Sequence, residues 1–276
     1  MSGPSIDPDA FRDFERAAHS RNAATYTDLF TVVTDRASAP LLDAAKVGPG
    51  TRLLDIAAGP GRMTQAGTER GAIAIGVDLA PAMVALAREH YPNIEFREAS
   101  ADALPFSDAS FDTVVCAFGL GHFPDAECVI AEIRRVLVPQ GRVAVSWWEG
   151  FSRNRINGIF HEAIARLAIS VPGVVPQGPP MDRFSDRARF AEFLAAAGFK
   201  DVQIDSVTFT HRLRDSDELW ALAMGSFARA AATIGAQTEA VQRQIREAVS
   251  EAVLQYAAPA GLEIPVAFLI GAGVRP

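Results

Sequence analysis

The chain has 276 residues, of which 49% are hydrophobic and 21% charged, an ordinary composition for a globular protein with a full core. Its formal net charge is −7 at pH 7 and its pI is near 5.3. A general nucleic-acid binder usually carries a basic surface and a high pI, so the charge disfavours that class.

The first half of the chain reads as helices followed by alternating strands and helices. We expect helices over 9–46, with a break near Pro40. Strands are then predicted at 52–57, 72–79, 94–100, 111–118 and 141–148, with helices at 62–70, 81–90 and 125–138. Three of the strands are nearly all apolar, as in sheets covered on both faces. The alternation predicts an α/β fold, with a parallel sheet and helices on both faces.

The regular alternation of strands and helices ends after Glu149. Helices are predicted at 155–169, 186–197, 216–232 and 238–257, and strands at 201–213 and 264–274. The segment 171–184 is rich in Pro and Gly, and reads either as a lid or as a connector. We expect one domain over 1–276: N-terminal helices 1–46, a core 50–149, cap helices in 150–200 and 214–260, and terminal strands 201–213 and 264–274.

Cysteine usage and hydropathy bear on the compartment and on metal binding. Cys116 and Cys128 have neither a CxxC partner nor a nearby histidine cluster, so we expect no metal site. Two free thiols fit a reducing compartment. The polar, acidic start of the chain does not resemble a secretory signal, and no run approaches the roughly 18 apolar residues of a membrane span. We therefore expect a cytoplasmic protein.

The stretch "LLDIAAGPGRMT" runs from a strand pattern through a glycine turn into a helix pattern, as nucleotide-binding turns do. Gly59 and Gly61 allow the backbone to approach a ligand closely. Asp78 follows about 20 residues later, at the end of the next strand, where a carboxylate can accept both ribose hydroxyls. Up to this point NAD and S-adenosylmethionine fit equally well.

The segment after the third strand favours S-adenosylmethionine. Thr64 replaces the third glycine of a dinucleotide loop, and nothing suggests a cradle for a pyrophosphate. Asp102, in "ADALPF", is placed to accept the exocyclic amine of an adenine. The residues expected against the ring are Ala101, Ala103 and Leu104.

Five motifs occur in order: "LLDIAAGPGR", "GVDLAPAMV", "ADALPF", "FDTVVCAFGLGHFPD" and "RRVLVPQGRVAVS". Over 50–149 the sequence resembles the class I S-adenosylmethionine-dependent methyltransferases, in the UbiE-like branch of ubiquinone and menaquinone C-methyltransferases. The resemblance implies a Rossmann-like sheet of seven strands with a reversed last hairpin, and S-adenosylmethionine as cofactor. The usual first glycine of the turn is Ala57 here.

The resemblance also implies roles for single residues. Asp55 and the turn Ala57–Gly61 would hold the methionine end of the cofactor, and Asp78 its ribose. The adenine side would be lined by Leu79 and Met83, with Asp102 on the amine. The methionine portion would contact Ala117 and Phe118, and Tyr26 would close over the cofactor.

Residues after the fourth and fifth strands are expected to face the methyl acceptor. His122 is the first candidate for a general base, although it could instead cap the next helix or shape the pocket, and Glu149 is the second. Trp147, Trp148 and Phe151 suggest a flat or apolar acceptor, with Trp147 equally suited to the core. The following arginines, Arg153 and Arg155, could pair with an anionic group or simply be solvated.

We therefore expect methyl transfer to a small molecule, without nucleic-acid or membrane partners, by a monomer or homodimer. One alternative is a module that binds the cofactor without transferring its methyl group, as a pericyclase-like or regulatory protein. The other is a nicotinamide-dependent oxidoreductase, against which the missing third glycine argues.

Overall fold

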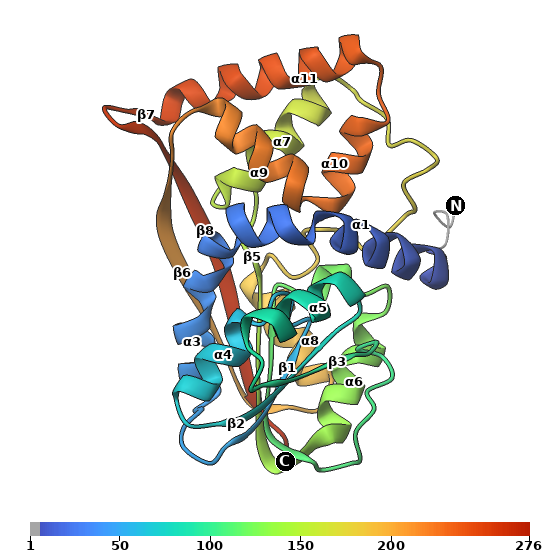
Figure 1. Cartoon of the computed structure of the whole chain (residues 1–276), viewed down its shortest axis with the longest axis vertical. Coiled ribbons are helices and arrows are strands. Elements are labelled where there is room, and N and C mark those ends of the chain that lie inside the picture. Colours follow the sequence, from blue (N-terminus) through green and yellow to red (C-terminus); the bar gives the residue numbers. More distant parts are fainter. Residues whose placement is uncertain (1–5) are drawn as a thin grey trace.

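A mixed sheet runs through the lower part of the molecule in the computed structural model, which describes residues 6–276 (Figure 1). Its strands lie in the order β3 (Glu95–Glu98), β2 (Ile73–Asp78), β1 (Arg52–Ile56), β4 (Phe111–Ala117), β5 (Leu137–Trp148), β8 (Gly261–Val274) and β6 (Lys200–Leu213). Neighbours from β3 to β5 are parallel, whereas β8 is antiparallel to both β5 and β6. The predicted Rossmann-like sheet with an antiparallel last strand is confirmed. A short β7 (Ala257–Ala258) pairs with the start of β8.

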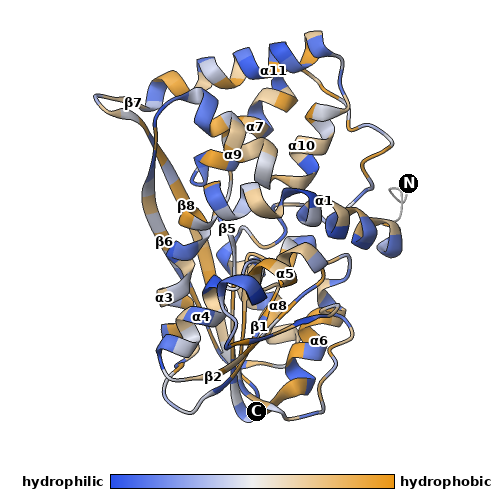
Figure 2. Ribbon diagram, viewed as in Figure 1, coloured by the Kyte–Doolittle hydropathy of each residue, from blue (hydrophilic) through white to orange (hydrophobic). Residues whose placement is uncertain are grey.

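Helices flank this sheet, and its strands are the most apolar part of the fold (Figure 2). The flanking helices are α3 (Ser38–Ala44), α4 (Arg62–Glu69), α5 (Pro81–His90), α6 (Ala126–Val136) and α8 (Arg187–Ala196). Five residues at the centre of β1 and β4 illustrate the burial, since none of them is exposed: Leu53, Leu54, Val114, Val115 and Cys116. Apolar runs of this kind are what a sheet covered on both faces requires.

The remaining helices lie above the sheet (Figure 1). We call α7 (Arg155–Arg166), α9 (Ser216–Ser226), α10 (Ala228–Gly235) and α11 (Glu239–Ala252) the cap helices. Helix α1 (Pro8–Leu29) lies between the cap helices and the sheet, and contacts both α5 and α9. No helix within 6–276 is long and apolar enough to cross a membrane.

The structure corrects three predicted boundaries. The N-terminal helices break at Phe30, followed by α2 (Thr31–Thr34) and a 3-10 turn (Asp35–Ala37), and not near Pro40. Pro40 lies in the first turn of α3, where a missing N–H breaks no helical bond. The predicted helix 216–232 divides at Phe227 into α9 and α10. Strand β5 begins at Leu137, before a register shift that includes Gln140 at φ 64°.

Two further helices end earlier than predicted. Helix α7 ends at Arg166, and α11 ends at Ala252 and continues as a 3-10 turn (Val253–Tyr256). The Pro/Gly-rich segment 171–184 contains neither helix nor strand. These differences leave the architecture unchanged, because they affect the ends of elements and not their order.

Candidate functional site

The turn after β1 has a backbone that few residues can adopt. Ala57, Gly59 and Gly61 all lie in the left-handed region, at φ 57°, 54° and 88°. A Cβ on Gly61 would stand 2.7 Å from the ring of Phe96, so this position excludes a side chain. The left-handed conformation costs Ala57 about 1–2 kcal/mol relative to a right-handed one. Backbone strain of this kind tends to persist where a ligand is held.

Asp78 ties this turn to the next strand. Its Oδ2 accepts a hydrogen bond from the Gly59 amide at 2.8 Å, and its Oδ1 accepts one from Ala80 at 2.8 Å. Burial raises the pKa of Asp78, against the two backbone hydrogen bonds and the charges of His19 and His122. The carboxylate has lone pairs left for further donors, as a ribose diol would supply.

Asp55 lies in β1, just before this turn. Its side chain is fully buried, and its Oδ2 accepts a hydrogen bond from Thr64 Oγ1 at 2.6 Å. Burial raises the pKa of Asp55 to about 7. Its Oδ1 has no hydrogen-bond partner within 6–276, although Asp55 does not line the cavity described next. Thr64, which replaces a glycine of the dinucleotide pattern, therefore anchors α4 to β1.

A cavity of about 730 Å³ lies between the carboxyl ends of the strands and the cap helices, a size typical of ligand sites. Most of the residues that sequence analysis assigns to the site line it: Tyr26, Ala57, Gly59, Asp78, Leu79, Met83, Ala101, Asp102, Ala117, Phe118, His122, Trp148 and Phe151. Besides Asp55, five do not: Gly61, Ala103, Leu104, Trp147 and Glu149.

The side chains outside the cavity have other partners. Trp147 is fully buried, and its Nε1 donates a hydrogen bond to the Met181 carbonyl at 2.8 Å. Glu149 accepts hydrogen bonds from Arg153 at 2.8 Å and from Ser206 Oγ at 2.7 Å. Arg155, in turn, pairs with a glutamate of its own helix. Neither arginine is therefore free for an anionic group.

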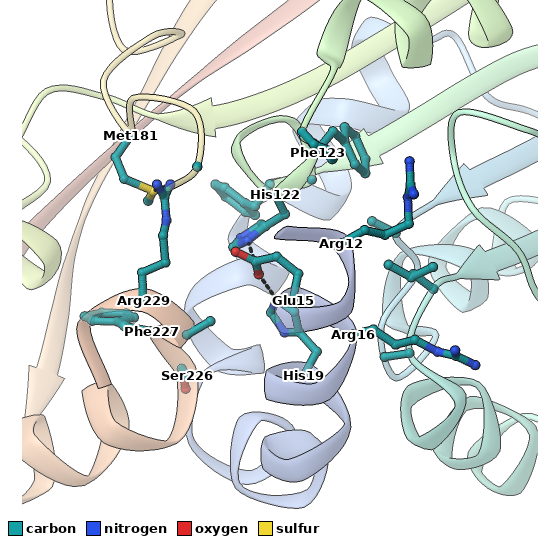
Figure 3. Close-up of a pocket in the computed structure, with 18 of the residues that line it drawn as sticks. Arg12, Glu15, Arg16, His19, His122, Phe123, Met181, Ser226, Phe227 and Arg229 are labelled. Carbon is teal, nitrogen blue, oxygen red and sulfur yellow. Dashed lines mark hydrogen bonds and ion pairs between the residues drawn. The ribbon is translucent and has the colours of Figure 1, made fainter. Parts of the chain in front are cut away.

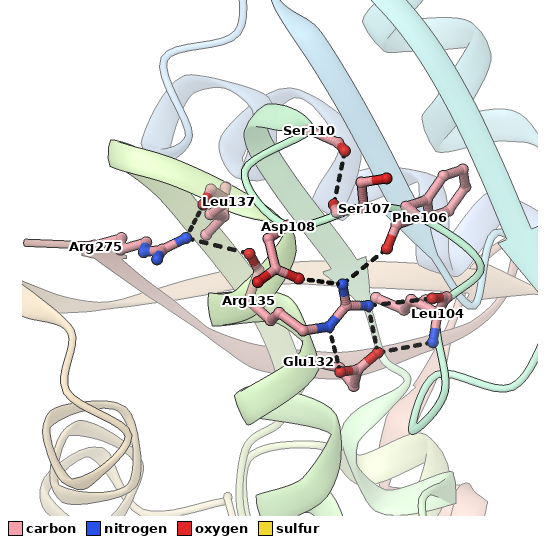
Figure 4. Close-up of polar contacts among 9 residues, drawn as sticks. All are labelled: Leu104, Phe106, Ser107, Asp108, Ser110, Glu132, Arg135, Leu137 and Arg275. Carbon is pink, nitrogen blue, oxygen red and sulfur yellow. Dashed lines mark hydrogen bonds and ion pairs between the residues drawn. The ribbon is translucent and has the colours of Figure 1, made fainter.

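Hydrogen bonds from Arg135 of α6 hold the loop that carries Asp102 (Figure 4). The Arg135 guanidinium donates hydrogen bonds to the carbonyls of Leu104 and Phe106 at 3.1 and 2.8 Å, and pairs with Glu132 at 2.6 Å. Glu132 in turn accepts a hydrogen bond from the Leu104 amide at 2.9 Å. The carboxylates of Glu132 and Asp108 raise the pKa of Arg135.

Helix α1 contributes charged groups that sequence analysis does not assign to the site. Arg12 donates to Asp102 at 2.6 Å, and Arg16 forms an ion pair with Glu98 at the end of β3. Asp102, expected to meet an adenine amine, is thus already paired. Tyr26, on the same helix, is the one α1 residue that sequence analysis places at the cofactor, and burial raises its pKa to about 12.

A buried carboxylate joins two histidines on the cavity wall (Figure 3). Glu15 Oε2 lies 3.0 Å from His122 Nδ1 and 3.2 Å from His19 Nε2, and the side chain is only 3% exposed. Burial alone would raise the pKa of Glu15, but the charges and hydrogen bonds of the two histidines lower it. Burial by itself lowers the pKa of His19. The hydrogen bond and the charge of Glu15 raise it by more, so the net effect is a raised pKa.

These three residues could also hold a metal ion, since their ligand atoms all lie within 4.8 Å of one another. Sequence analysis gives no role to Glu15 or His19. The available signal is their spacing of four residues on a helix, which places both on one face. Nothing in that spacing indicates that His122, more than a hundred residues later, lies opposite.

Comparisons with known proteins point to methyltransferases. A family model described as a methyltransferase domain matches residues 54–145. A demethylmenaquinone methyltransferase from Thermus thermophilus is 44% identical over 57% of this chain and 78% of its own length. An uncharacterised protein from Mycobacterium tuberculosis is 33% identical over 63% of this chain, and the match spans less than two thirds, 64%, of its length.

Among solved structures, the fold is similar to phosphoethanolamine N-methyltransferase 2 from Haemonchus contortus in complex with S-adenosylhomocysteine. The TM-score is 0.58, the identity 19%, and the match covers 96% of this chain and 60% of the other. At this identity the likeness concerns the fold.

Proposed function

Because the chain belongs to the class I S-adenosylmethionine-dependent methyltransferases, in the UbiE-like branch, we propose that it transfers a methyl group to a small, largely apolar acceptor by in-line displacement. The observation that carries this proposal is the continuity of the cavity. It extends from Asp78 and the turn after β1, past His122, to the apolar side chains of the cap helices.

The residues on the sheet side fit this cofactor. When bound, S-adenosylmethionine supplies a methyl group on a sulfonium, already activated for displacement. Asp78 would accept the ribose hydroxyls, since its carboxylate is held by two backbone amides and faces the cavity. Leu79, Met83 and Ala101 offer apolar surface for the adenine. The strained turn beginning at Ala57 would hold the methionine end.

His122 is the group best placed to take a proton from the acceptor. Its Nδ1 contacts the ionised Glu15, so Nδ1 carries the hydrogen and Nε2 keeps its lone pair. This arrangement resembles the carboxylate–histidine pairs in which the carboxylate fixes the tautomer. A positioned base contributes about 10²–10⁴-fold to the rate. Glu149, the other candidate, lies outside the cavity and is bonded to Arg153.

Positioning is the other contribution of the protein. Helix α1 and the cap helices cover the cavity, so acceptor and methyl donor would meet away from water. Holding two reactants in alignment contributes roughly 7–11 kcal/mol in favourable cases. Phe118 borders the expected methyl position, and its ring stacks on Trp148 with centroids 4.0 Å apart. This stacked pair would give an aromatic acceptor a flat wall.

Calorimetric titration with S-adenosylhomocysteine tests the cofactor assignment. We expect one site, and a loss of affinity of about 10–150-fold in Asp78→Asn, since hydrogen bonds to a charged group contribute about 1.5–3 kcal/mol. Asp112→Asn is the matched control, because Asp112 lies outside the cavity and pairs with Arg52. A folded protein that gives no heat would refute the proposal.

Transfer itself is tested with a labelled methyl group and fractionated metabolite extracts. Label should appear in a small organic product, and His122→Gln should slow its formation without weakening S-adenosylhomocysteine binding. A cofactor that binds tightly but never loses its label would favour the non-methylating alternative.

A further inference from the structure

Three arginines line the cavity, and one of them has no carboxylate partner. Arg12 and Arg16 are paired with Asp102 and Glu98. Arg229 of α10 has no carboxylate oxygen within 4.0 Å among residues 6–276. Burial lowers its pKa, and only the charge of the more distant Glu15 opposes that effect. A partly buried cation without an anion is costly, and a bound anion would remove that cost.

The partners that Arg229 does have leave most of its donors free. Its Nη1 donates to the Pro179 carbonyl at 2.8 Å, its Nη2 touches the Met181 sulfur, and its guanidinium lies 5.5 Å from the ring of Phe11 (Figure 3). A guanidinium has five N–H donors. The contacts therefore hold the group in place at the cavity wall without using up its hydrogen-bonding capacity.

Two features next to Arg229 along the chain also lack side-chain partners among the described residues. Ser226 is only 7% exposed and lines the cavity, and its Oγ is buried without a hydrogen-bond partner in the described chain. Helix α10 begins directly afterwards, at Ala228, and no side chain caps it. The first amides of a helix have no acceptor within the helix, and its N-terminus favours negative charge.

We propose that Arg229, beside the start of α10, forms an anion subsite that binds the carboxylate of a small apolar acceptor acid. The inference rests on the proposed function, because it assumes that the cap end of the cavity takes the acceptor. It assigns the chemical class of that acceptor, which the cofactor motifs do not specify.

A carboxylate fits better than a phosphate. The subsite offers one formal positive charge, on Arg229, so a monoanion is neutralised and a dianion is not. Glu15 is ionised and lies on the same cavity wall, which adds repulsion for a second negative charge. The planar guanidinium matches the two oxygens of a carboxylate. The surrounding side chains, among them Phe160, Phe227 and Met181, suit an apolar body.

The experiment compares 2-naphthoate with its uncharged analogue 2-naphthamide. Both are titrated into the protein saturated with S-adenosylhomocysteine. We expect naphthoate to bind at least about tenfold more tightly, as one charge-assisted hydrogen bond implies. Arg229→Met should remove this preference and leave naphthamide binding unchanged. Arg243→Met, on an exposed part of α11, is the matched control and should keep the preference.

Arg229→Lys provides a second variant should Arg229→Met fail to fold; it keeps the positive charge but loses the planar pair of donors, and should reduce the preference by a smaller factor. Equal affinity of the wild-type protein for the two probes would overturn the subsite, as would an unchanged preference in Arg229→Met. Binding of S-adenosylhomocysteine is measured in the same samples. Its absence, with the naphthoate preference intact, would count against the proposed function and not against the subsite.

Discussion

Replacing Glu15 by glutamine would test the buried cluster at the centre of the site. Glutamine keeps the shape of the side chain and one oxygen acceptor, but removes the charge. In the wild-type protein that charge lies 3.0 Å from His122 Nδ1 and 3.2 Å from His19 Nε2. The substitution therefore changes electrostatics while leaving the packing of α1 nearly intact.

The expected loss of stability follows from the burial. Glu15 is 3% exposed, so water screens its interactions only weakly. A hydrogen bond to a charged group contributes about 1.5–3 kcal/mol, and glutamine can retain part of it, so we expect a loss of about 2 kcal/mol. With an unfolding entropy of about 2.1 cal/mol/K per residue, a 276-residue chain loses about 3–4 °C in Tm.

The stability that Glu15 and His19 contribute should fall at both acid and alkaline pH. The pKa of Glu15 is lowered in the folded state, so its contribution is full above its ordinary value of 4.5 and disappears as the pH falls below that value. The pKa of His19 is raised, so its contribution is full below 6.5 and disappears as the pH rises through the folded value. The Tm difference between wild type and Glu15→Gln should therefore be largest between pH 4.5 and 6.5.

Thermal unfolding followed across this range measures the difference. Glu263→Gln is the matched control, because Glu263 pairs with Arg212 at the surface and an arginine does not titrate at high pH. That control should lose stability by less than about 1 kcal/mol, without a decline above neutrality. A difference for Glu15→Gln that stays constant from acid to alkaline pH would refute the electrostatic coupling.

Two further predictions concern α1 and the packing beneath the site. Arg16→Ala should release S-adenosylhomocysteine up to about fivefold faster in stopped-flow experiments, since its ion pair with Glu98 holds α1 beside β3 and a surface ion pair contributes about 0.2–1 kcal/mol; an unchanged rate would show that this ion pair does not retain the cofactor. Gly121→Ala should destabilise the protein by about 1–3 kcal/mol, because the new Cβ would stand 2.1 Å from the buried ring of Trp147. Gly235→Ala, with no heavy atom within 4 Å, should leave the Tm unreduced, and equal shifts in the two variants would contradict the packing argument.

The cofactor half of the site could be predicted because its residues follow from local patterns. Asp78 and Gly59 are 19 positions apart, yet Asp78 ends β2 and Gly59 lies in the turn after β1, and parallel strands end at the same edge of a sheet. The same rule brings Asp102 and Phe118 to that edge. Once the strands are recognised from their apolar runs, little is left for tertiary packing to decide.

The acceptor half depends on packing between distant segments, which the sequence does not specify. The sequence predicts helices over 9–46 but not which surface they cover, so it assigns no role to Glu15 or Arg12. It places Trp148 at the acceptor and leaves Trp147 equally suited to the acceptor pocket or the core. Adjacent residues of a strand point to opposite faces, and only Trp148 lines the cavity. Applying that alternation to β5 would have separated the pair.

The position of α1 links cofactor binding to the acceptor side. Arg12 and Glu15 are three residues apart, so they lie on the same side of the helix. Arg12 occupies the carboxylate that the adenine amine is expected to use, while Glu15 fixes the tautomer of His122. A cofactor whose adenine amine takes the Asp102 carboxylate would therefore compete with Arg12. Helix α1 thus contributes to both halves of the site, Arg12 beside the expected adenine position and Glu15 beside the expected base.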